Sequence, residues 1–424
     1  MLKRISFKDW KSLQTQSTFD DDKISVVKTI INDVITNKDE ALKKYTLKFD
    51  GVELENLQVS VLEIEKAYKE CDPLLISDLE LAYKNILAFH KLQLPTDYKT
   101  KVLSNSYIGQ KNTPIEQVGI YVPAGTAAYP STVLMNAAPA LIAGVKRIAM
   151  ISPPQIDGSI DPIILVAAKI AGITEIYKVG GAQGIAALAY GTQTIKPVFK
   201  IVGPGNIYVA LAKREVFGKV GIDMIAGPSE ILVYADSSSN PSFVAADLLS
   251  QAEHDALARP ILVTEDEALI DAVDKELVKQ LKKLPRADYA SIAIENNGYA
   301  LVASSKKEAI EIINTIAPEH LELLVENAED VSKEITNAGA IFIGGYSPEP
   351  LGDYIAGPNH TLPTSGTATF SSALGVYDFM KRTSLISYSK EDLNTYKNNI
   401  IRIAQKEGLD AHANAVKVRF FNEN

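Results

Sequence analysis

The feature that most constrains this chain is an alternation of short apolar runs, rich in β-branched residues, with stretches of helical periodicity. The first set of runs is expected to form strands at Val118–Val122, Arg147–Ile151, Glu175–Val179 and Val198–Val202. Strands that alternate with helices at this spacing form βαβ units, because consecutive parallel strands need a long crossover connection. The alternation therefore predicts a parallel α/β sheet.

A second set of runs follows Gly227 and predicts strands at Ile231–Ala235, Pro260–Thr264, Ser291–Ile294 and Ala340–Ile343. Helical stretches again separate these strands. A chain of 424 residues is long enough for more than one domain of about 100–200 residues. We therefore expect two Rossmann-like parallel-sheet domains.

The two ends of the chain differ from this central part. Residues 1–110 are mainly helical in pattern, with an amphipathic helix over Asp20–Asn37 and a connection or polar hairpin over Asp97–Thr113. From Tyr377 to Asn424 the chain is charged and helical in pattern, without strand alternation. This last segment is expected to be a C-terminal helical extension.

Charge and hydropathy exclude several classes of protein. A formal net charge of −9 without a basic stripe argues against a nucleic-acid partner. The first residues lack the apolar segment of a signal peptide, and the most apolar stretch, Thr132–Val145, is interrupted by Asn136 and Pro139. We expect a cytoplasmic protein that does not bind membranes.

Cys71 is the only cysteine, so an internal disulfide and a cysteine-rich zinc knuckle are both impossible. Aldehydes can be oxidised through a cysteine thiohemiacetal, and only Cys71 could supply that nucleophile. It lies in an acidic helical stretch away from the glycine-rich turns, which favours an incidental thiol. A cysteine-free route is expected.

Three glycine-rich turns follow predicted strands and precede predicted helices, at Tyr121–Thr126, Val179–Gly184 and Val202–Asn206. Free backbone N–H groups at such helix N-termini can bind a phosphate or pyrophosphate. Any one of these turns could equally be a simple tight turn, and none matches the GxGxxG pattern. Together they indicate a nucleotide-like anion site of low specificity.

The five histidines are His90, His254, His320, His360 and His412. Gln251 and His254 are three residues apart at the end of a predicted helix, so both could reach one metal ion. Asp353 and His360 follow the apolar run Ile341–Ile343 and are expected beyond the carboxyl end of that strand. Imidazole and carboxylate donors without thiolate suit a zinc site with room for substrate, although a polar helix end or a turn would explain each motif alone.

Glu319 and His320 follow a proline and are expected to open a helix through Leu321–Leu324. Histidine, with an ordinary pKa of about 6.5, can accept and return a proton near neutral pH, and an adjacent carboxylate can act on water. A Glu-His pair at a helix start is also common on plain surfaces.

Taken in order, the motifs resemble the histidinol dehydrogenase family from about Val118 to the C-terminal region. The segments that carry the resemblance are Gln117–Pro123, Ser131–Met135, Val179–Gln183, Ile185–Thr192, Gly203–Asn206, Ile222–Met224, Ala226–Glu230, Gln251–His254, Ala317–Leu321, Gly352–Tyr354 and Ala356–His360. The first hundred residues resemble the family mainly in length and helical character.

The resemblance implies an NAD-dependent, four-electron oxidation of L-histidinol through L-histidinaldehyde to L-histidine, the last step of histidine biosynthesis. The implied catalytic pair is Glu319, which activates water, and His320, which takes up protons. One Zn²⁺ per subunit, which orients the substrate, has the implied ligands Gln251, His254, Asp353 and His412. Implied substrate contacts are Ser229, Gln251, His254, His320, Asp353, Glu407 and His412, and implied NAD contacts are Tyr121, Gln183 and Asn206.

The resemblance also implies a domain-swapped homodimer in which the C-terminal segment reaches the active site of the partner subunit. The domains expected on this basis are an arm (1–20), a discontinuous first α/β domain with a helical N-terminal part (21–117 plus 230–373), a second α/β domain with the NAD-binding turns (118–229) and the C-terminal extension (374–424). Glu407 and His412 lie in that extension.

Two positions depart from the pattern of the family. Ala124 stands where glycine is common, and Gly184 stands where alanine is common. Both lie in turns assigned to NAD, so they bear on cofactor geometry more than on the reaction.

Two other functions remain open on the sequence. A zinc hydrolase could use Glu319 to activate a metal-bound water, and would not depend on NAD. A non-catalytic relative could keep the dimer and bind a ligand for regulation, but the joint presence of the ligand residues with Glu319 and His320 argues against it.

Overall fold

The computed structural model describes residues 1–13, 21–124 and 128–420. These residues form two compact units. The first comprises Met1–Gln93 and Ile115–Phe379, and the second comprises Leu94–Pro114 and the chain from Met380 onward. Within the described residues, no helix combines the length and apolar character needed to cross a membrane.

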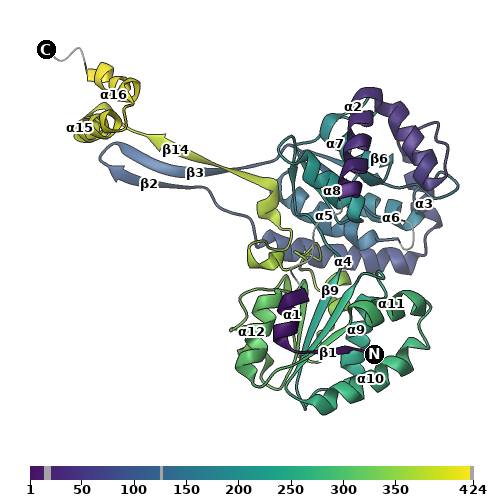
Figure 1. Ribbon diagram of the computed structural model, residues 1–424. Coiled ribbons are helices and arrows are strands. Elements are labelled where there is room, and N and C mark those ends of the chain that lie inside the picture. The colour runs from purple at the N-terminus through teal and green to yellow at the C-terminus, as the bar shows by residue number, and fades with distance from the viewer. Residues whose placement is uncertain (14–20, 125–127, 421–424) are drawn as a thin grey trace. The chain divides into compact units, whose positions relative to one another are not determined.

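The first unit contains a six-stranded parallel sheet (Figure 1) with the order β1-β11-β10-β9-β12-β13. Its strands are β1 (Lys3–Ile5), β9 (Glu230–Ala235), β10 (Arg259–Thr264), β11 (Tyr299–Val302), β12 (His320–Leu324) and β13 (Ala340–Ile343). Every residue of β9 is buried, as expected for a central strand of a parallel sheet covered on both faces.

Helices cover both faces of this sheet because successive strand side chains point to opposite sides. Ile231 and Val233 pack into one core with helices α9 (Pro241–Ala252), α10 (Glu267–Leu281) and α11 (Ala287–Asn297). Leu232 and Tyr234 pack into the other with α1 (Phe7–Leu13), α12 (Lys306–Ile316) and α13 (Ala328–Ser332).

A five-stranded parallel sheet of the same unit has the order β6-β5-β4-β7-β8. Its strands are β4 (Gln117–Tyr121), β5 (Arg147–Ser152), β6 (Glu175–Lys178), β7 (Lys200–Val202) and β8 (Gly221–Ile222), and the intervening helices are α5 (Pro130–Ala143), α6 (Pro162–Ile170), α7 (Gly181–Tyr190) and α8 (Ile207–Val216). The prediction of two parallel α/β sheets is confirmed.

The N-terminal helices pack on the five-stranded sheet. Helix α2 (Asp21–Asp50) lies against α7 and α8, α3 (Val61–Glu70) against α6, and α4 (Pro73–Lys91) against α5. The domain boundaries predicted from the sequence place residues 21–117, which include these helices, with residues 230–373. Periodicity shows that a helix has an apolar stripe, but it does not show which sheet that stripe covers.

The first residues, expected to be an arm, form part of the six-stranded sheet. Strand β1 pairs in parallel with β11, and Trp10 of α1 is buried in the core beneath it. Residues 14–20 of the expected arm lie outside the described residues.

Two secondary-structure predictions in this unit were wrong. Ser291–Ile294 lies inside helix α11, and the strand follows at β11. Leu321–Leu324 continues strand β12 rather than a helix. Both segments are short, and a short apolar run has no periodicity that separates a strand from a helix.

The second unit contains an antiparallel sheet with the order β14-β3-β2 and two helices that pack on each other. Its elements are β2 (Tyr98–Leu103), β3 (Ser106–Pro114), β14 (Met380–Ser387), α15 (Lys390–Lys406) and α16 (Asp410–Lys417). The polar hairpin is confirmed as β2–β3. The purely helical character expected after Tyr377 was wrong, because β14 pairs with β3 over eight residues.

The helices of the second unit lie at the turn end of the hairpin (Figure 1). The Asp392 carboxylate accepts hydrogen bonds from the Ser106 hydroxyl (2.6 Å) and the Asn105 backbone N–H (2.8 Å). These bonds attach the start of α15 to the hairpin.

Candidate active site

The candidate site lies at the amino edge of the six-stranded sheet. Strand β9 begins at Glu230 and β12 begins at His320, so these residues lie at the same end of two paired parallel strands. Helix α9 follows β9 and returns to this edge, which brings Gln251 and His254 to its end.

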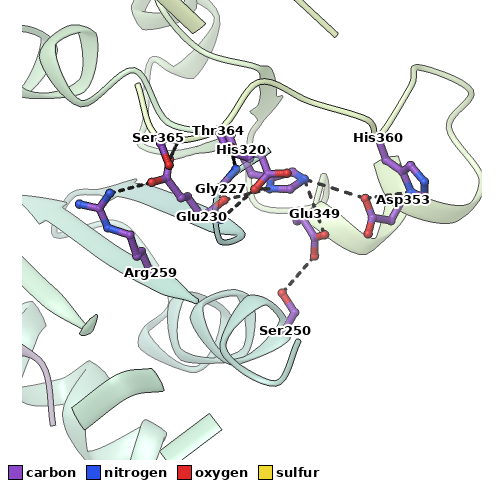
Figure 2. Close-up of polar contacts among 11 residues, drawn as sticks. Gly227, Glu230, Ser250, Arg259, His320, Glu349, Asp353, His360, Thr364 and Ser365 are labelled. Atoms are coloured by element: carbon purple, nitrogen blue, oxygen red, sulfur yellow. Dashed lines mark hydrogen bonds and ion pairs between the residues drawn. The ribbon is translucent and has the colours of Figure 1, made fainter. Parts of the chain in front are cut away.

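Asp353 reaches the same edge, and not the carboxyl end of β13 as the sequence suggested. The chain turns back after β13 into helix α14 (Glu349–Tyr354), and the Asp353 carboxylate lies 3.9 Å from Nε2 of His320. Figure 2 shows Glu349, Asp353 and His360 on this returning segment beside His320. The place of Asp353 in the sequence, after β13, therefore did not indicate the edge of the sheet at which its side chain lies.

His320 is buried and held in one orientation. Its Nδ1 lies 2.9 Å from the carbonyl oxygen of Glu230, which can only accept, so Nδ1 carries the proton and donates. Nε2 is then an unprotonated base, and it is buried without a hydrogen-bond partner among the described residues. Burial lowers the pKa of His320, which favours this neutral form.

Glu319 lies on the other side of the imidazole. Helix α12 ends at Ala317, which has a left-handed backbone (φ 49°), and the chain then turns through Pro318 into β12. The Glu319 carboxylate accepts from the Glu230 backbone N–H (2.8 Å) and lies 3.8 Å from Nδ1 of His320. Burial, and then the nearby carboxylates, raise its pKa well above the ordinary value.

Glu230 supports both catalytic candidates. Its carbonyl and N–H contact His320 and Glu319, while its buried carboxylate accepts from Arg259 (2.8 Å) and from the Ser365 N–H (3.2 Å). These contacts (Figure 2) order the residue on which the pair depends.

A group of side chains that could hold a metal ion lies next to His320. Donor atoms of His254, Glu349 and Asp353 lie within 4.8 Å of one another. Gln251, on the last turn of α9, has a buried side-chain oxygen without a hydrogen-bond partner among the described residues. Nitrogen and oxygen donors without thiolate fit zinc.

Burial shapes the charge of this group. It lowers the pKa of His254 to about 4, so the imidazole is neutral and able to bind a metal. It raises the pKa of Asp353 to about 6 and that of Glu349 to about 8. A cation would favour the charged carboxylates that burial alone disfavours.

His360 connects this group to the five-stranded sheet. Its Nδ1 lies 3.7 Å from the Asp353 carboxylate, and its Nε2 lies 3.5 Å from the Thr132 hydroxyl in the first turn of α5. The neighbouring Asn359 donates to the carbonyl of Met135, also in α5 (2.6 Å). Helix α5 follows β4, so the segment around His360 joins the two sheets.

The predicted NAD residues lie at the carboxyl edge of the five-stranded sheet. The buried Tyr121 hydroxyl accepts from the Gly181 N–H (3.3 Å), and burial raises its pKa to about 12. Gln183, on α7, is buried with its side-chain oxygen free of hydrogen bonds in the described structure. Asn206 is exposed and caps α8, since its side-chain oxygen accepts from the N–H groups of Tyr208 and Val209.

The turn after β7 is held by a buried ion pair that sequence reasoning missed. Lys213 of α8 pairs with Asp223 and donates to the carbonyl of Gly203 (2.9 Å). The Asp223 carboxylate accepts from the Gly203 N–H (2.8 Å). Residues 125–127, in the turn that follows β4, lie outside the described residues.

The remaining predicted residues belong to different units. Ser229 immediately precedes β9, where its carbonyl accepts from the Arg259 N–H (3.0 Å). Glu407 and His412 belong to the second unit, at the end of α15 and in α16.

Glu349 was also missed by sequence reasoning. It is four residues before Asp353, so the two share a helix face, and this spacing could have indicated it.

Comparison with known proteins identifies the family of the chain. The sequence profile of histidinol dehydrogenase matches residues 13–420. A histidinol dehydrogenase of Listeria monocytogenes is 55% identical over 400 residues, which cover 94% of this chain and 93% of the relative. One from Bacillus subtilis is 53% identical over 393 residues, covering 93% and 92%.

The structural comparison gives the same result. The crystal structure of histidinol dehydrogenase from Elizabethkingia anophelis superposes with a TM-score of 0.93 at 40% identity, covering 99% of this chain and 98% of that one. Such extensive similarity in sequence and fold shows that the chain belongs to the histidinol dehydrogenase family.

Proposed function

We propose that this chain oxidises L-histidinol through L-histidinaldehyde to L-histidine, the last step of histidine biosynthesis, with NAD as the oxidant. The observation that carries the proposal is the buried His320, which has Glu319 beside its Nδ1 and the carboxylates of Glu349 and Asp353 beside its free Nε2. Membership of the family supplies the substrate.

The side chains fit the two cofactors that the family implies. Gln251, His254 and Asp353, with His412 from a second copy of the chain, would hold zinc. Tyr121, Gln183 and Asn206 would contact NAD at the carboxyl edge of the five-stranded sheet, where open α/β sheets bind ligands. When bound, zinc supplies a cation that holds substrate nitrogens, and NAD supplies the electron acceptor for each oxidation.

His320 acts as the base in the first oxidation. Its Nε2 accepts the hydroxyl proton of the substrate, and the backbone carbonyl of Glu230 stabilises the imidazolium through Nδ1. The alcohol carbon loses two electrons and becomes the aldehyde. The burial of the site protects this reactive aldehyde from bulk water until Glu319 activates a water molecule to hydrate it.

Glu319 acts in the second half of the reaction. Its carboxylate takes a proton from water as the water oxygen bonds to the aldehyde carbon. The His320 imidazolium returns its proton to the aldehyde oxygen, which forms the hydrate and leaves His320 neutral again. The high pKa of Glu319 makes it an effective proton acceptor when ionised. His320 then removes a hydrate proton, and loss of two further electrons produces the carboxylic acid.

The substrate would be contacted by residues of two subunits. The first unit of one subunit would supply Ser229, Gln251, His254, His320 and Asp353, and the partner subunit would supply Glu407 and His412. This assignment requires a domain-swapped homodimer. The second unit supports it, because Ala404 and Ala413 are its only buried apolar residues among those described, while larger apolar side chains are exposed. These exposed residues are Leu94, Tyr98, Ile108, Ile386, Tyr388, Tyr396, Ile400, Ile403, Leu409 and Val418.

The proposal is tested by counting NADH formed per histidinol consumed by the purified, zinc-loaded protein. Two NADH per histidinol, lost in His320→Ala, is expected. One NADH would mean that oxidation stops at the aldehyde. Hydrolytic activity in the absence of histidinol would favour a zinc hydrolase instead. A folded dimer that forms no NADH would favour either the hydrolase or a non-catalytic relative.

A further inference from the structure

We propose that Glu322 is a positioning residue that ties helices α9 and α14 to strand β12. These three elements carry the candidate site. The proposed zinc ligands Gln251, His254 and Asp353 lie at the end of α9, just after it, and in α14, and His320 begins β12. The inference rests on the proposed function only in assuming that zinc binds here, and it leaves the proposed ligands unchanged.

Glu322 faces the same side of the sheet as His320. The two residues are two apart on β12, and alternate residues of a strand point to one face. Glu322 is 0% exposed. A buried polar group costs free energy unless it is hydrogen-bonded, so each oxygen of this carboxyl group needs a partner within the protein.

One oxygen of Glu322 supports the start of α14. Its Oε1 accepts the backbone N–H of Glu349, the first residue of the helix, at 2.6 Å. The preceding residue, Pro348, makes no side-chain cap hydrogen bond, and the first N–H groups of a helix have no partner inside it. Asp353 follows one turn later, so the bond to Glu322 helps to fix where its carboxylate lies.

The carboxyl group of Glu322 also bonds to Asp247 of α9. Two carboxylates are both acceptors, so this hydrogen bond requires a proton on one of them. Burial, followed by the charge of Asp247, raises the pKa of Glu322, which makes Glu322 the donor. Its Oε2 is buried and receives no hydrogen bond from a described donor, and a proton on Oε2 accounts for both observations.

The contacts around Glu322 form a closed ring of three elements. Asp247 lies one helical turn before Gln251, so the two residues share a face of α9. Ser250 of the same helix donates to the Glu349 carboxylate of α14 at 3.1 Å (Figure 2). Glu322 makes the other two contacts of the ring, one to each helix. Its loss would leave α9 and α14 joined only through Ser250 in this ring.

The experiment compares Glu322→Gln and Glu322→Met with a matched control, Leu324→Ala, in the full-length protein. Glutamine can accept the Glu349 N–H and donate to Asp247, whereas methionine can do neither. Leu324 is buried two residues further along the same face of β12, in the apolar core with α9. Its truncation destabilises the strand but removes no polar contact.

Three quantities are measured for each variant. Zn²⁺ affinity is obtained by competition with a chromophoric chelator, the visible absorption of the Co²⁺-loaded protein reports the geometry of the site, and denaturant unfolding of the metal-free protein reports stability. Glu322→Met should weaken Zn²⁺ binding about 10–100-fold, the usual effect of losing an outer contact of a metal site, and should alter the Co²⁺ spectrum. Glu322→Gln should weaken binding less than about 10-fold and keep the spectrum.

Leu324→Ala should lower the unfolding midpoint while both metal readouts stay close to wild type. The inference is overturned if Glu322→Met changes the metal readouts no more than Leu324→Ala does, or if Glu322→Gln is as impaired as Glu322→Met. If Glu322→Met does not fold, the half-buried Asp247 takes its place. Asp247→Ala must then weaken Zn²⁺ binding more than the control does, and Asp247→Asn must restore it.

The NADH count of the wild-type enzyme is measured in parallel. Two NADH per histidinol, with metal readouts of the Glu322 variants that follow the control, would reject the positioning role alone. Metal readouts that depend on Glu322 as expected, without NADH formation, would reject the proposed function alone. A wild-type protein that binds no Zn²⁺ would overturn both.

Discussion

The amino edge of the six-stranded sheet and the carboxyl edge of the five-stranded sheet are built from different chemical groups. At the first edge, buried ionisable side chains lie close together. The carboxylates of Glu319 and Glu349 lie 3.8 Å and 3.9 Å from the imidazole nitrogens of His320. At the second, glycine turns and backbone groups predominate, held by Tyr121 and by the Lys213–Asp223 pair.

The difference indicates a division of labour. Side chains with shifted pKa values can transfer protons and bind a cation, whereas backbone N–H groups at helix starts can bind a polyanion without changing protonation. Substitutions at the first edge should therefore act on kcat or metal binding. Substitutions at the second should act on the KM for NAD or on stability.

The largest effect is expected for His320→Ala, which removes the proposed base of both oxidations. General-base catalysis contributes about 10²–10⁴-fold, so kcat should fall by that factor with both histidinol and the aldehyde. Steady-state rates with each substrate measure this. Bound zinc and NAD affinity are the controls, and a kcat close to wild type would remove His320 from the mechanism.

Glu319→Gln should separate the two halves of the reaction. Glutamine can still accept the Glu230 N–H bond, but it cannot take a proton from water. NADH per histidinol should fall from two toward one, with aldehyde turnover reduced by about 10²-fold or more. Product analysis for accumulated aldehyde checks the result, and an unchanged ratio of two would contradict the role of Glu319.

Asp223→Asn should sharpen the comparison from the NAD side. It leaves Lys213 buried without its counter-charge, which typically costs about 3–5 kcal/mol of unfolding free energy. The Gly203 turn should loosen, so KM for NAD should rise while kcat at saturating NAD is largely kept. Denaturant unfolding and NAD titration of rates test this, and a fall in kcat alone would contradict the proposed division.

The smallest effect is expected for Gly184→Ala, which restores the residue common in the family. Alanine gains about 1 kcal/mol over glycine inside a helix, but its Cβ would lie 2.8 Å from the Cδ1 of Ile151. The terminal methyl of Ile151 must move, and the cost of this movement largely offsets the gain in helix propensity. Thermal unfolding should change by a few degrees at most, and a loss of NAD binding would show that this turn is more tightly constrained than its packing indicates.

Particular residues show how far the sequence could be read. The sequence correctly predicted strands at Ile231–Ala235 and Val118–Val122. A short apolar run between two helical stretches in an α/β pattern is most often a buried strand. Leu321–Leu324 was misread as a helix because so short a buried run shows no periodicity that separates a helix from a strand. Local patterns singled out Gln251, His254, Asp353, Glu319 and His320 as candidates, and the family resemblance assigned their roles. Glu349 was not singled out, although its spacing from Asp353 could have indicated it.

The sequence by itself determined the two parallel α/β sheets, the polar hairpin and the family, because these depend on local periodicity and on the order of short motifs. Only the tertiary structure decided that helices α2–α4 cover the five-stranded sheet and that α14 returns to the amino edge of the other. It also decided that Glu349 lies with His254 and Asp353. These are contacts between segments far apart in the chain, and they depend on how apolar faces pack together, which no local pattern specifies.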